Sequence, residues 1–173
     1  MNQEVKEIYL AGGCFWGLEK YIAQIKGVEK TQVGYANGKT DEPTYQDVCY
    51  LDTGHAETVK VIFNPTILSL QKLLQLYFKV IDPTSLNKQG NDVGTQYRTG
   101  IYYIEKEDRT IIDEAIQELQ KKYEKSIAIE VTQLDNYFTA EEYHQNYLDK
   151  HPMGYCHIGK EWFDYARIES EKD

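Results

Sequence analysis

The chain has 173 residues, of which 41% are hydrophobic and 27% are charged, a composition typical of a globular domain with a core of its own. Its formal net charge of −9 argues against a nucleic-acid partner, because a protein that binds a phosphate backbone needs positive charge. No stretch reaches the roughly 18 uninterrupted apolar residues of a membrane span, and the polar, partly acidic N-terminus does not resemble a signal peptide. We therefore expect a single domain over residues 1–173 with no membrane partner.

The three cysteines, Cys14, Cys49 and Cys156, are too few and too scattered for the disulfide framework of a small secreted protein. This usage favours a reducing, cytoplasmic location in which any disulfide is transient. The chain also contains 15 tyrosines against 5 phenylalanines, so many of its aromatic rings carry a hydroxyl that needs a partner when buried. Some of these phenols are candidates for lining a pocket with a polar end.

Strands and helices alternate in the first part of the chain. An apolar run predicts a strand at residues 6–11, which Gly12 and Gly13 end, and a helix is expected over residues 15–25. A second strand is expected at residues 28–35, where a turn signal follows.

The middle of the chain begins with a loop that carries a short helical piece at residues 42–49. Residues 57–63 alternate between apolar and polar side chains and predict a third strand. Leucine and aromatic residues at spacings of three and four predict an amphipathic helix over residues 70–81, which Asp82 and Pro83 end.

A long irregular stretch is expected over residues 84–96, which are rich in Asn and Gly, and loops of this length are commonly functional. Four further elements follow in chain order: a strand at residues 97–104, a helix at 112–123, a strand at 127–134 and a short polar helix at 140–150. From Pro152 onward the chain is expected to be irregular, with a frayed end.

The element order is β-α-β-β-α-β, followed by one more helix and strand. This order matches the split βαβ, ferredoxin-like motif with additions. We therefore expect an α/β (α+β) fold in which helices pack on a mixed β-sheet, followed by an irregular C-terminal segment.

The turn between the first strand and the first helix carries a cysteine between glycines and large aromatic residues. Gly12 and Gly13 allow unusual backbone angles there. Cys14 precedes the first turn of the helix, where unpaired N–H groups and the helix dipole lower a thiol pKa from its free value of about 8.5. The alternative is a buried, inert cysteine in a core with Phe15 and Trp16, and the local sequence does not decide between them.

Chemistry-bearing residues gather in six short stretches: Gly13-Cys14-Phe15-Trp16-Gly17, Pro43-Thr44-Tyr45, Gly54-His55-Ala56-Glu57, Gly90 to Arg98, Tyr143 to Tyr147 and Gly154-Tyr155-Cys156. In this order the six stretches resemble the motifs of the peptide methionine sulfoxide reductase A family. The resemblance extends from about residue 8 to residue 159, and six motifs in the same order make it specific.

The resemblance implies a two-cysteine oxidoreductase that reduces methionine S-sulfoxide, free or protein-bound, to methionine. Cys14 would attack the sulfoxide sulfur, Glu57 would donate a proton to the departing oxygen, and Cys156 would resolve the sulfenic acid as a disulfide. Taken alone, Glu57 also fits a solvated carboxylate at a strand end, and Cys156 a free surface thiol.

Five further residues match family positions that bind the substrate. Phe15 and Trp16 would form an apolar wall for the methyl group, and the phenols of Tyr45 and Tyr97 would hydrogen-bond the sulfoxide oxygen. Asp92 would have a supporting role. Without the resemblance, the aromatic residues fit ordinary packing and Asp92 fits a turn-stabilising aspartate.

The resemblance also implies that thioredoxin reduces the Cys14–Cys156 disulfide. No cysteine follows Cys156 in the sequence, so we expect the reductant to meet this disulfide directly. Cys49 is interpreted as a buried structural thiol and is the fallback resolver if Cys156 fails.

No cofactor or metal is expected. The four histidines are His55, His144, His151 and His157, and they show no C-x-x-C or H-x-x-x-H spacing that would indicate zinc. The glycines of residues 90–94 match no phosphate-binding loop, and no dinucleotide fingerprint follows the first strand.

Two other functions remain open from the residues themselves. A cysteine hydrolase or acyltransferase would use Cys14 as the nucleophile with a histidine as its base, although the sequence marks no partner histidine. A non-enzymatic thiol redox sensor would form a disulfide with peroxide but would not turn over sulfoxide.

Overall fold

The computed structural model describes residues 4–172. Its strands are β1 (Lys6–Ala11), β2 (Val28–Ala36), β3 (Ala56–Phe63), β4 (Lys88–Gln89), β5 (Asp92–Val93), β6 (Gly100–Tyr103), β7 (Glu130–Gln133) and β8 (Tyr137–Thr139). Its α-helices are α1 (Phe15–Ala23), α2 (Tyr45–Tyr50), α3 (Leu70–Phe78), α4 (Lys106–Gln120), α5 (Tyr147–Lys150) and α6 (Glu161–Ser170). Two short 3-10 helices are η1 (Thr95–Tyr97) and η2 (Glu142–His144).

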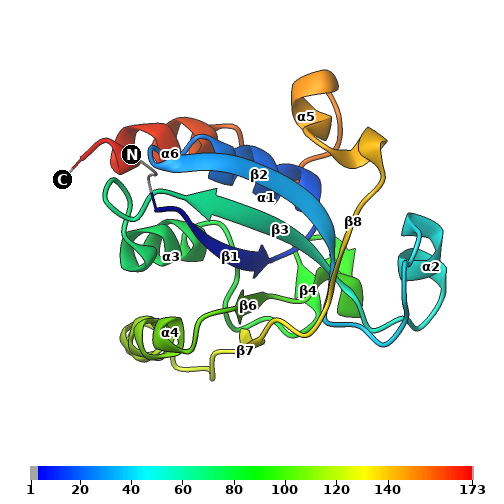
Figure 1. Ribbon diagram of the computed structural model, residues 1–173, viewed down its shortest axis with the longest axis horizontal. Coiled ribbons are helices and arrows are strands. Elements are labelled where there is room, and N and C mark those ends of the chain that lie inside the picture. The colour runs from blue at the N-terminus through cyan, green and yellow to red at the C-terminus, as the bar shows by residue number, and fades with distance from the viewer. Residues whose placement is uncertain (1–3, 173) are drawn as a thin grey trace.

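The main sheet has the strand order β7-β6-β1-β3-β2-β8 (Figure 1). Strand β1 pairs antiparallel with both β3 and β6, and β2 pairs antiparallel with β3. This central order is that of the predicted split βαβ motif. The sheet is mixed, as expected, because β7 joins β6 in parallel. The predicted fold class is confirmed.

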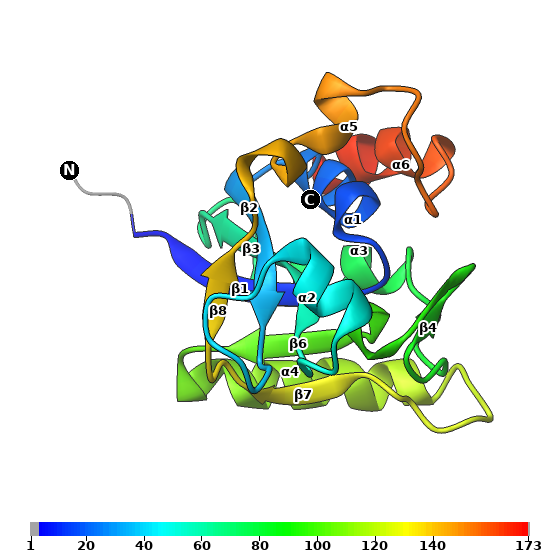
Figure 2. The same cartoon turned by 90° about the vertical axis from the view of Figure 1, so that its right-hand side faces the viewer.

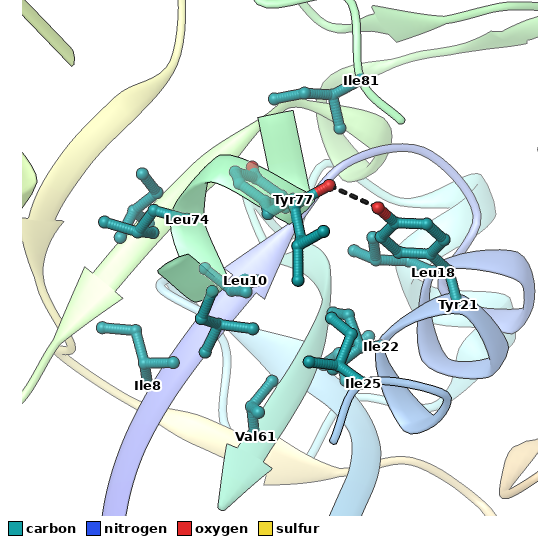
Figure 3. Close-up of a cluster of buried hydrophobic side chains, with 14 of the residues drawn as sticks. Ile8, Leu10, Leu18, Tyr21, Ile22, Ile25, Val61, Leu74, Tyr77 and Ile81 are labelled. Atoms are coloured by element: carbon teal, nitrogen blue, oxygen red, sulfur yellow. Dashed lines mark hydrogen bonds between the residues drawn. The ribbon is translucent and has the colours of Figure 1, made fainter. Parts of the chain in front are cut away.

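The core forms where α1 and α3 pack on one face of the sheet. Alternate residues of β1, Ile8 and Leu10, lie on this face together with Val61 of β3. Figure 3 shows these side chains beside Tyr21 of α1 and Leu74 of α3. The other face carries a smaller buried group that includes Tyr9, Ala11 and Tyr102.

The hydroxyl groups of buried tyrosines in this core donate hydrogen bonds to backbone carbonyl oxygens. The hydroxyl of Tyr21 donates to the carbonyl of Leu76 at 2.6 Å (Figure 3), and that of Tyr77 donates to the carbonyl of Ala11 at the end of β1. The polar ends of these rings therefore join the helices to each other and to the sheet, which accounts for part of the tyrosine excess.

The stretch from residue 84 to 104 is more structured than expected. It contains the β4–β5 hairpin, and Tyr97 lies in η1 rather than on the predicted strand 97–104, which begins only at Gly100. Tyr97 donates its backbone N–H to the carbonyl of Gly94 at 3.0 Å, so the backbone turns there instead of extending.

The predicted helix over residues 140–150 is wrong as a continuous element. Asn146 has φ 52°, a left-handed conformation that separates η2 from α5. The short strand β8 before it was also not predicted. It pairs with β2 at the edge of the sheet and so depends on a tertiary partner.

The predicted irregular C-terminal segment is correct for residues 152–160 but wrong for residues 161–170, which form α6 and pack against α1. Asp173, at the end predicted to be frayed, lies outside the described residues. No side chain caps the start of α6, so the usual helix-start signal is missing. The side chain of Ser170 accepts a hydrogen bond from the backbone N–H of Lys26 at 2.8 Å, which anchors the end of the helix just beyond α1.

None of the helices formed by residues 4–172 has the length and apolar character needed to cross a bilayer.

Candidate active site

The turn that carries Cys14 joins the end of β1 to the start of α1. Gly13 has φ +76°, a conformation that favours glycine, and its N–H donates to the carbonyl of Tyr97 at 3.1 Å. A Cβ on Gly12 would stand 2.7 Å from the side chain of Ile81, so only glycine fits there. In both views the β4–β5 hairpin lies beside this end of β1 (Figure 1, Figure 2). The turn therefore holds Cys14 between the end of β1, the start of α1 and the segment that runs from the β4–β5 hairpin to Tyr97.

The thiol of Cys14 is buried and protonated at neutral pH. Burial is the main cause that raises its pKa well above the ordinary value, and Glu57, once it ionises at higher pH, and Asp92 act in the same direction. The backbone N–H of Trp16, in the first turn of α1, favours the thiolate but is outweighed. The predicted lowering of this pKa by the helix N-terminus is therefore wrong for the resting protein.

Glu57 comes from the start of β3, and its side chain is 1% exposed. Its Oε1 accepts the backbone N–H of Phe15 at 3.1 Å, which places the carboxyl group beside the residue after Cys14. Burial raises the pKa of Glu57 to about 8, so the carboxyl is neutral at neutral pH. Its Oε2 is buried and has no hydrogen-bond partner in the described chain. This environment is not that of a solvated strand-end carboxylate.

Tyr45 at the start of α2 and Tyr97 in η1 bring two half-buried phenols toward the same carboxyl. Burial is the main cause that raises both phenol pKa values, and Glu57 raises both further once it ionises at higher pH. The phenols are therefore neutral hydrogen-bond donors. Cys49 lies near Tyr45 at the edge of this group and is partly exposed, whereas a buried thiol was expected.

Phe15 and Trp16 occupy different environments. Phe15 is fully buried, with its ring against Tyr35. Trp16 is partly buried and stacks on Tyr147 of α5, with ring centroids 3.8 Å apart. Its indole N–H donates to Nδ1 of His144 at 2.9 Å. Trp16 thus has a fixed orientation beside Cys14.

His144 is a site residue that was considered from the sequence only as a metal ligand and set aside. It is 1% exposed and contacts the rings of Phe15, Tyr45 and Tyr143 as well as Trp16. Nδ1 accepts from the indole, so the ring carries its proton on Nε2, which is buried without a partner in the described chain. The motif Tyr143 to Tyr147 was the available signal for this position.

Glu141 is a second carboxylate that the sequence did not single out. Its two oxygens accept the backbone N–H of Tyr45 at 2.9 Å and the hydroxyl of Tyr35 at 2.8 Å. Partial burial opposes ionisation, but these hydrogen bonds outweigh it and lower the pKa of Glu141 below its ordinary value. Glu141 therefore holds the start of α2, and with it the phenol of Tyr45, in place.

Cys156 and Asp92 lie on the other side of the turn. A Cβ on Gly17 would stand 2.8 Å from the Cys156 sulfur, so this thiol packs against the first turn of α1. Asp92, on β5, accepts the hydroxyl of Tyr155 at 3.0 Å through Oδ1. The charges of both Cys156 and Asp92 act on Cys14, which places all three groups close together. The fold thus gathers the predicted site residues around one turn.

Residues 4–172 contain no group of three His, Cys, Asp or Glu side chains placed to hold a metal. A hollow of about 810 Å³ lies between α3 and α4, and none of the site residues described above lines it. We identify the candidate site by the cluster of reactive and titratable side chains around Cys14 and not by the volume of a cavity.

Comparison with known proteins assigns the chain to a protein family. The model of the peptide methionine sulfoxide reductase family matches residues 6–172. The "Peptide methionine sulfoxide reductase MsrA" of Lachnoclostridium phytofermentans is 62% identical over 162 residues, which are 94% of this chain and 98% of that protein.

Solved structures agree with this relationship. Reduced Mxr1 from Saccharomyces cerevisiae has a TM-score of 0.84 and 40% identity, and the match covers 88% of this chain and 89% of Mxr1. The structure of Mxr1 in complex with Trx2 has a TM-score of 0.60 and 25% identity, with 85% and 89% covered. The chain therefore belongs to the peptide methionine sulfoxide reductase family.

Proposed function

We propose that this protein reduces methionine S-sulfoxide, free or in proteins, to methionine, with Cys14 as the nucleophile. The observation that carries the proposal is the buried, neutral carboxyl of Glu57, whose Oε1 accepts a hydrogen bond from the Phe15 N–H and whose Oε2 has no partner among residues 4–172. A sulfoxide oxygen is a strong acceptor that must gain protons as its bond to sulfur breaks. A protonated carboxylic acid beside a thiol can donate a proton to this oxygen while the thiol sulfur attacks.

The substrate oxygen is bound by Glu57 and the phenols of Tyr45 and Tyr97. All three groups are neutral donors, so they bind the oxygen more strongly as negative charge develops on it. The apolar side chain of Trp16 forms the wall for the methyl group, and Asp92 supports the opposite side. Phe15 backs this wall from within the core.

In the first step the sulfur of Cys14 attacks and bonds to the sulfoxide sulfur while Glu57 gives its proton to the oxygen. The bond between the two sulfurs then breaks as the protonated oxygen moves from the substrate sulfur to the sulfur of Cys14, and methionine leaves. The carboxylate of Glu57 recovers a proton from the thiol of Cys14, which is protonated at rest. The net result is one methionine and one sulfenic acid on Cys14.

In the second step Cys156 attacks the sulfenic sulfur, so that a Cys14–Cys156 disulfide and water form. Cys156 packs against the turn that carries Cys14, which supports its choice over Cys49. We propose thioredoxin as the reductant, because the related Mxr1 has been solved in complex with Trx2. The cycle needs no cofactor and proceeds in one catalytic domain over residues 1–173. Because it passes through a disulfide that must be reopened, we place it in the reducing cytoplasm.

A single turnover without reductant tests this assignment. The protein is mixed with one equivalent of a methionine S-sulfoxide peptide, and mass spectrometry identifies the joined cysteines. We expect a Cys14–Cys156 bond. Cys14→Ser should form no methionine, whereas Cys156→Ser should form one methionine per chain and then stop, even with thioredoxin present.

Cys49→Ser is the matched control and should cycle normally. Methionine formation by Cys14→Ser would overturn the nucleophile assignment. Sustained thioredoxin-driven turnover by Cys156→Ser would overturn the resolving assignment.

A further inference from the structure

His157 spans the turn that carries Cys14. A Cβ added to Gly13 would stand 2.8 Å from Nε2 of this histidine, and one added to Gly17 would stand 3.5 Å from its Nδ1. The imidazole therefore lies across the residues on both sides of Cys14. Its side chain is 6% exposed, and neither ring nitrogen meets the geometry of a full hydrogen bond within the described chain, although the backbone of Gly12 lies close enough to favour the protonated ring. A buried imidazole without a full hydrogen bond is costly, which points to a role beyond packing.

The resolving thiol and a carboxylate flank this imidazole. The Cys156 sulfur lies 2.8 Å from the same Gly17 position that Nδ1 approaches. On the other side Nδ1 is 3.8 Å from Oδ2 of Asp92, which is itself buried and unpartnered. The other oxygen of Asp92 is occupied by Tyr155. The charge of Asp92 at this distance favours the protonated ring.

The resolving step requires that the thiol of Cys156 lose its proton. The thiol of Cys156 donates to the carbonyl of Ile158 at 3.1 Å, and burial raises its pKa above the ordinary value. It is therefore protonated at neutral pH, whereas the species that attacks sulfur is the thiolate. A base within reach of Cys156 would remove this barrier.

We propose that His157 is the proton-transfer residue of the resolving step, with the carboxylate of Asp92 stabilising its protonated form. The imidazole takes the proton of the Cys156 thiol as its sulfur bonds to Cys14. The Cys14–oxygen bond breaks, and the imidazolium gives its proton to the leaving hydroxide, which departs as water. Cys156 is oxidised and Cys14 is reduced from sulfenic acid to disulfide, so atoms and electrons balance. The inference rests on the proposed two-cysteine cycle.

The ionisable groups that face His157 agree with this role. Asp92 on β5 favours the protonated ring, while burial is the larger influence and lowers the pKa of His157, so the ring is a neutral base at neutral pH. Cys14 and Cys156 face it from the turn and from its own segment. Lys20 of α1 acts on Cys156 and favours its thiolate.

The test separates the two chemical steps in single turnovers without reductant. Methionine formation and the loss of free thiols are followed by rapid quenching. His157→Gln should form methionine at a rate within about twofold of the wild type but close the disulfide about 10²-fold more slowly, the lower range for losing a general base. The wild-type rate of disulfide formation should fall as the pH drops and His157 is protonated, and this decline should vanish in His157→Gln.

His151→Gln is the matched control, because His151 is an exposed histidine in the same segment. It should leave both steps and the pH profile unchanged. A His157→Gly variant whose disulfide formation is restored by added imidazole would further support the role, since imidazole cannot repair a packing defect alone.

Disulfide formation by His157→Gln at the wild-type rate, with the wild-type pH profile, would overturn the inference. So would a slow His157→Gly variant that imidazole does not restore. Failure of the cycle itself gives a different result, in which the wild type forms no Cys14–Cys156 disulfide at all.

Discussion

Glu57 and Glu141 both lie near Tyr45, yet their environments drive their pKa values apart. Glu57 is buried with one hydrogen bond, so burial dominates and its pKa rises to about 8. Glu141 accepts two hydrogen bonds at the edge of the site, so its pKa falls. Such a separation is a common feature of acid–base sites. One carboxyl can therefore donate a proton while the other remains an anchor.

Glu57→Gln should stabilise the protein at high pH. The folded state raises the pKa of Glu57 from 4.5 to about 8, so it holds a proton that the unfolded chain releases. The stability of the wild type therefore declines as the pH rises through this window, and glutamine cannot lose a proton. The difference in unfolding free energy should grow to on the order of 4 kcal/mol by about pH 9.

Urea unfolding of both proteins between about pH 5 and 9 measures this difference. Glutamine keeps an oxygen that can accept the N–H of Phe15, so the comparison isolates the ionisation. A difference that does not change with pH would show that Glu57 is not the buried acid described above.

At the scale of elements, helices and strands with strong internal periodicity were predicted within a few residues. Strands β1, β2 and β3 and helices α1 and α3 are of this kind. Helix α6 was missed because its start has no capping residue and its apolar side chains serve a tertiary contact with α1. The break at Asn146 was missed because a left-handed asparagine has no reliable sequence signal.

Ala166→Leu should test the packing of α6. Ala166 is fully buried at the inner face of the helix, so a larger side chain would overpack the interface and lower the free energy of unfolding by about 1–3 kcal/mol. Arg167→Leu, one residue along on the exposed face, is the matched control and should change it little. Chemical denaturation compares the two. Equal stability of the two variants would show that α6 is not held by this contact.

At the scale of the whole molecule, the candidate site adjoins the core: Cys14 and Phe15 belong to the buried cluster, and Trp16, Tyr45, Tyr97 and Cys156 pack against it. The core lies between the sheet and helices α1 and α3 (Figure 3), while the site lies where β1, β3, η1 and the C-terminal segment meet. A rigid sheet can thus position Cys14 and Glu57, whereas the short segments that carry Tyr97 and Cys156 approach from the side.

Leu74→Ala should lower stability without altering the chemistry. Leu74 is fully buried in the core on α3, and its truncation should cost about 2–5 kcal/mol of unfolding free energy. The turnover of sulfoxide per folded chain should stay near the wild-type value. Gln75→Ala, on the exposed face of the same helix, is the control. Thermal unfolding and steady-state kinetics measure both effects, and a large loss of turnover in folded Leu74→Ala would contradict this prediction.

The sequence by itself determined the strand–turn–helix around Cys14, the order of the main elements and the family, because these depend on neighbouring residues and on motifs that can be read along the chain. Only the tertiary structure decided the protonation of the site. The local argument from the helix N-terminus favours a thiolate at Cys14, but burial beside Glu57, which is distant in the sequence, outweighs it. The placement of His157 over the same turn was likewise invisible, since nothing near it in the sequence shows which residues it will contact.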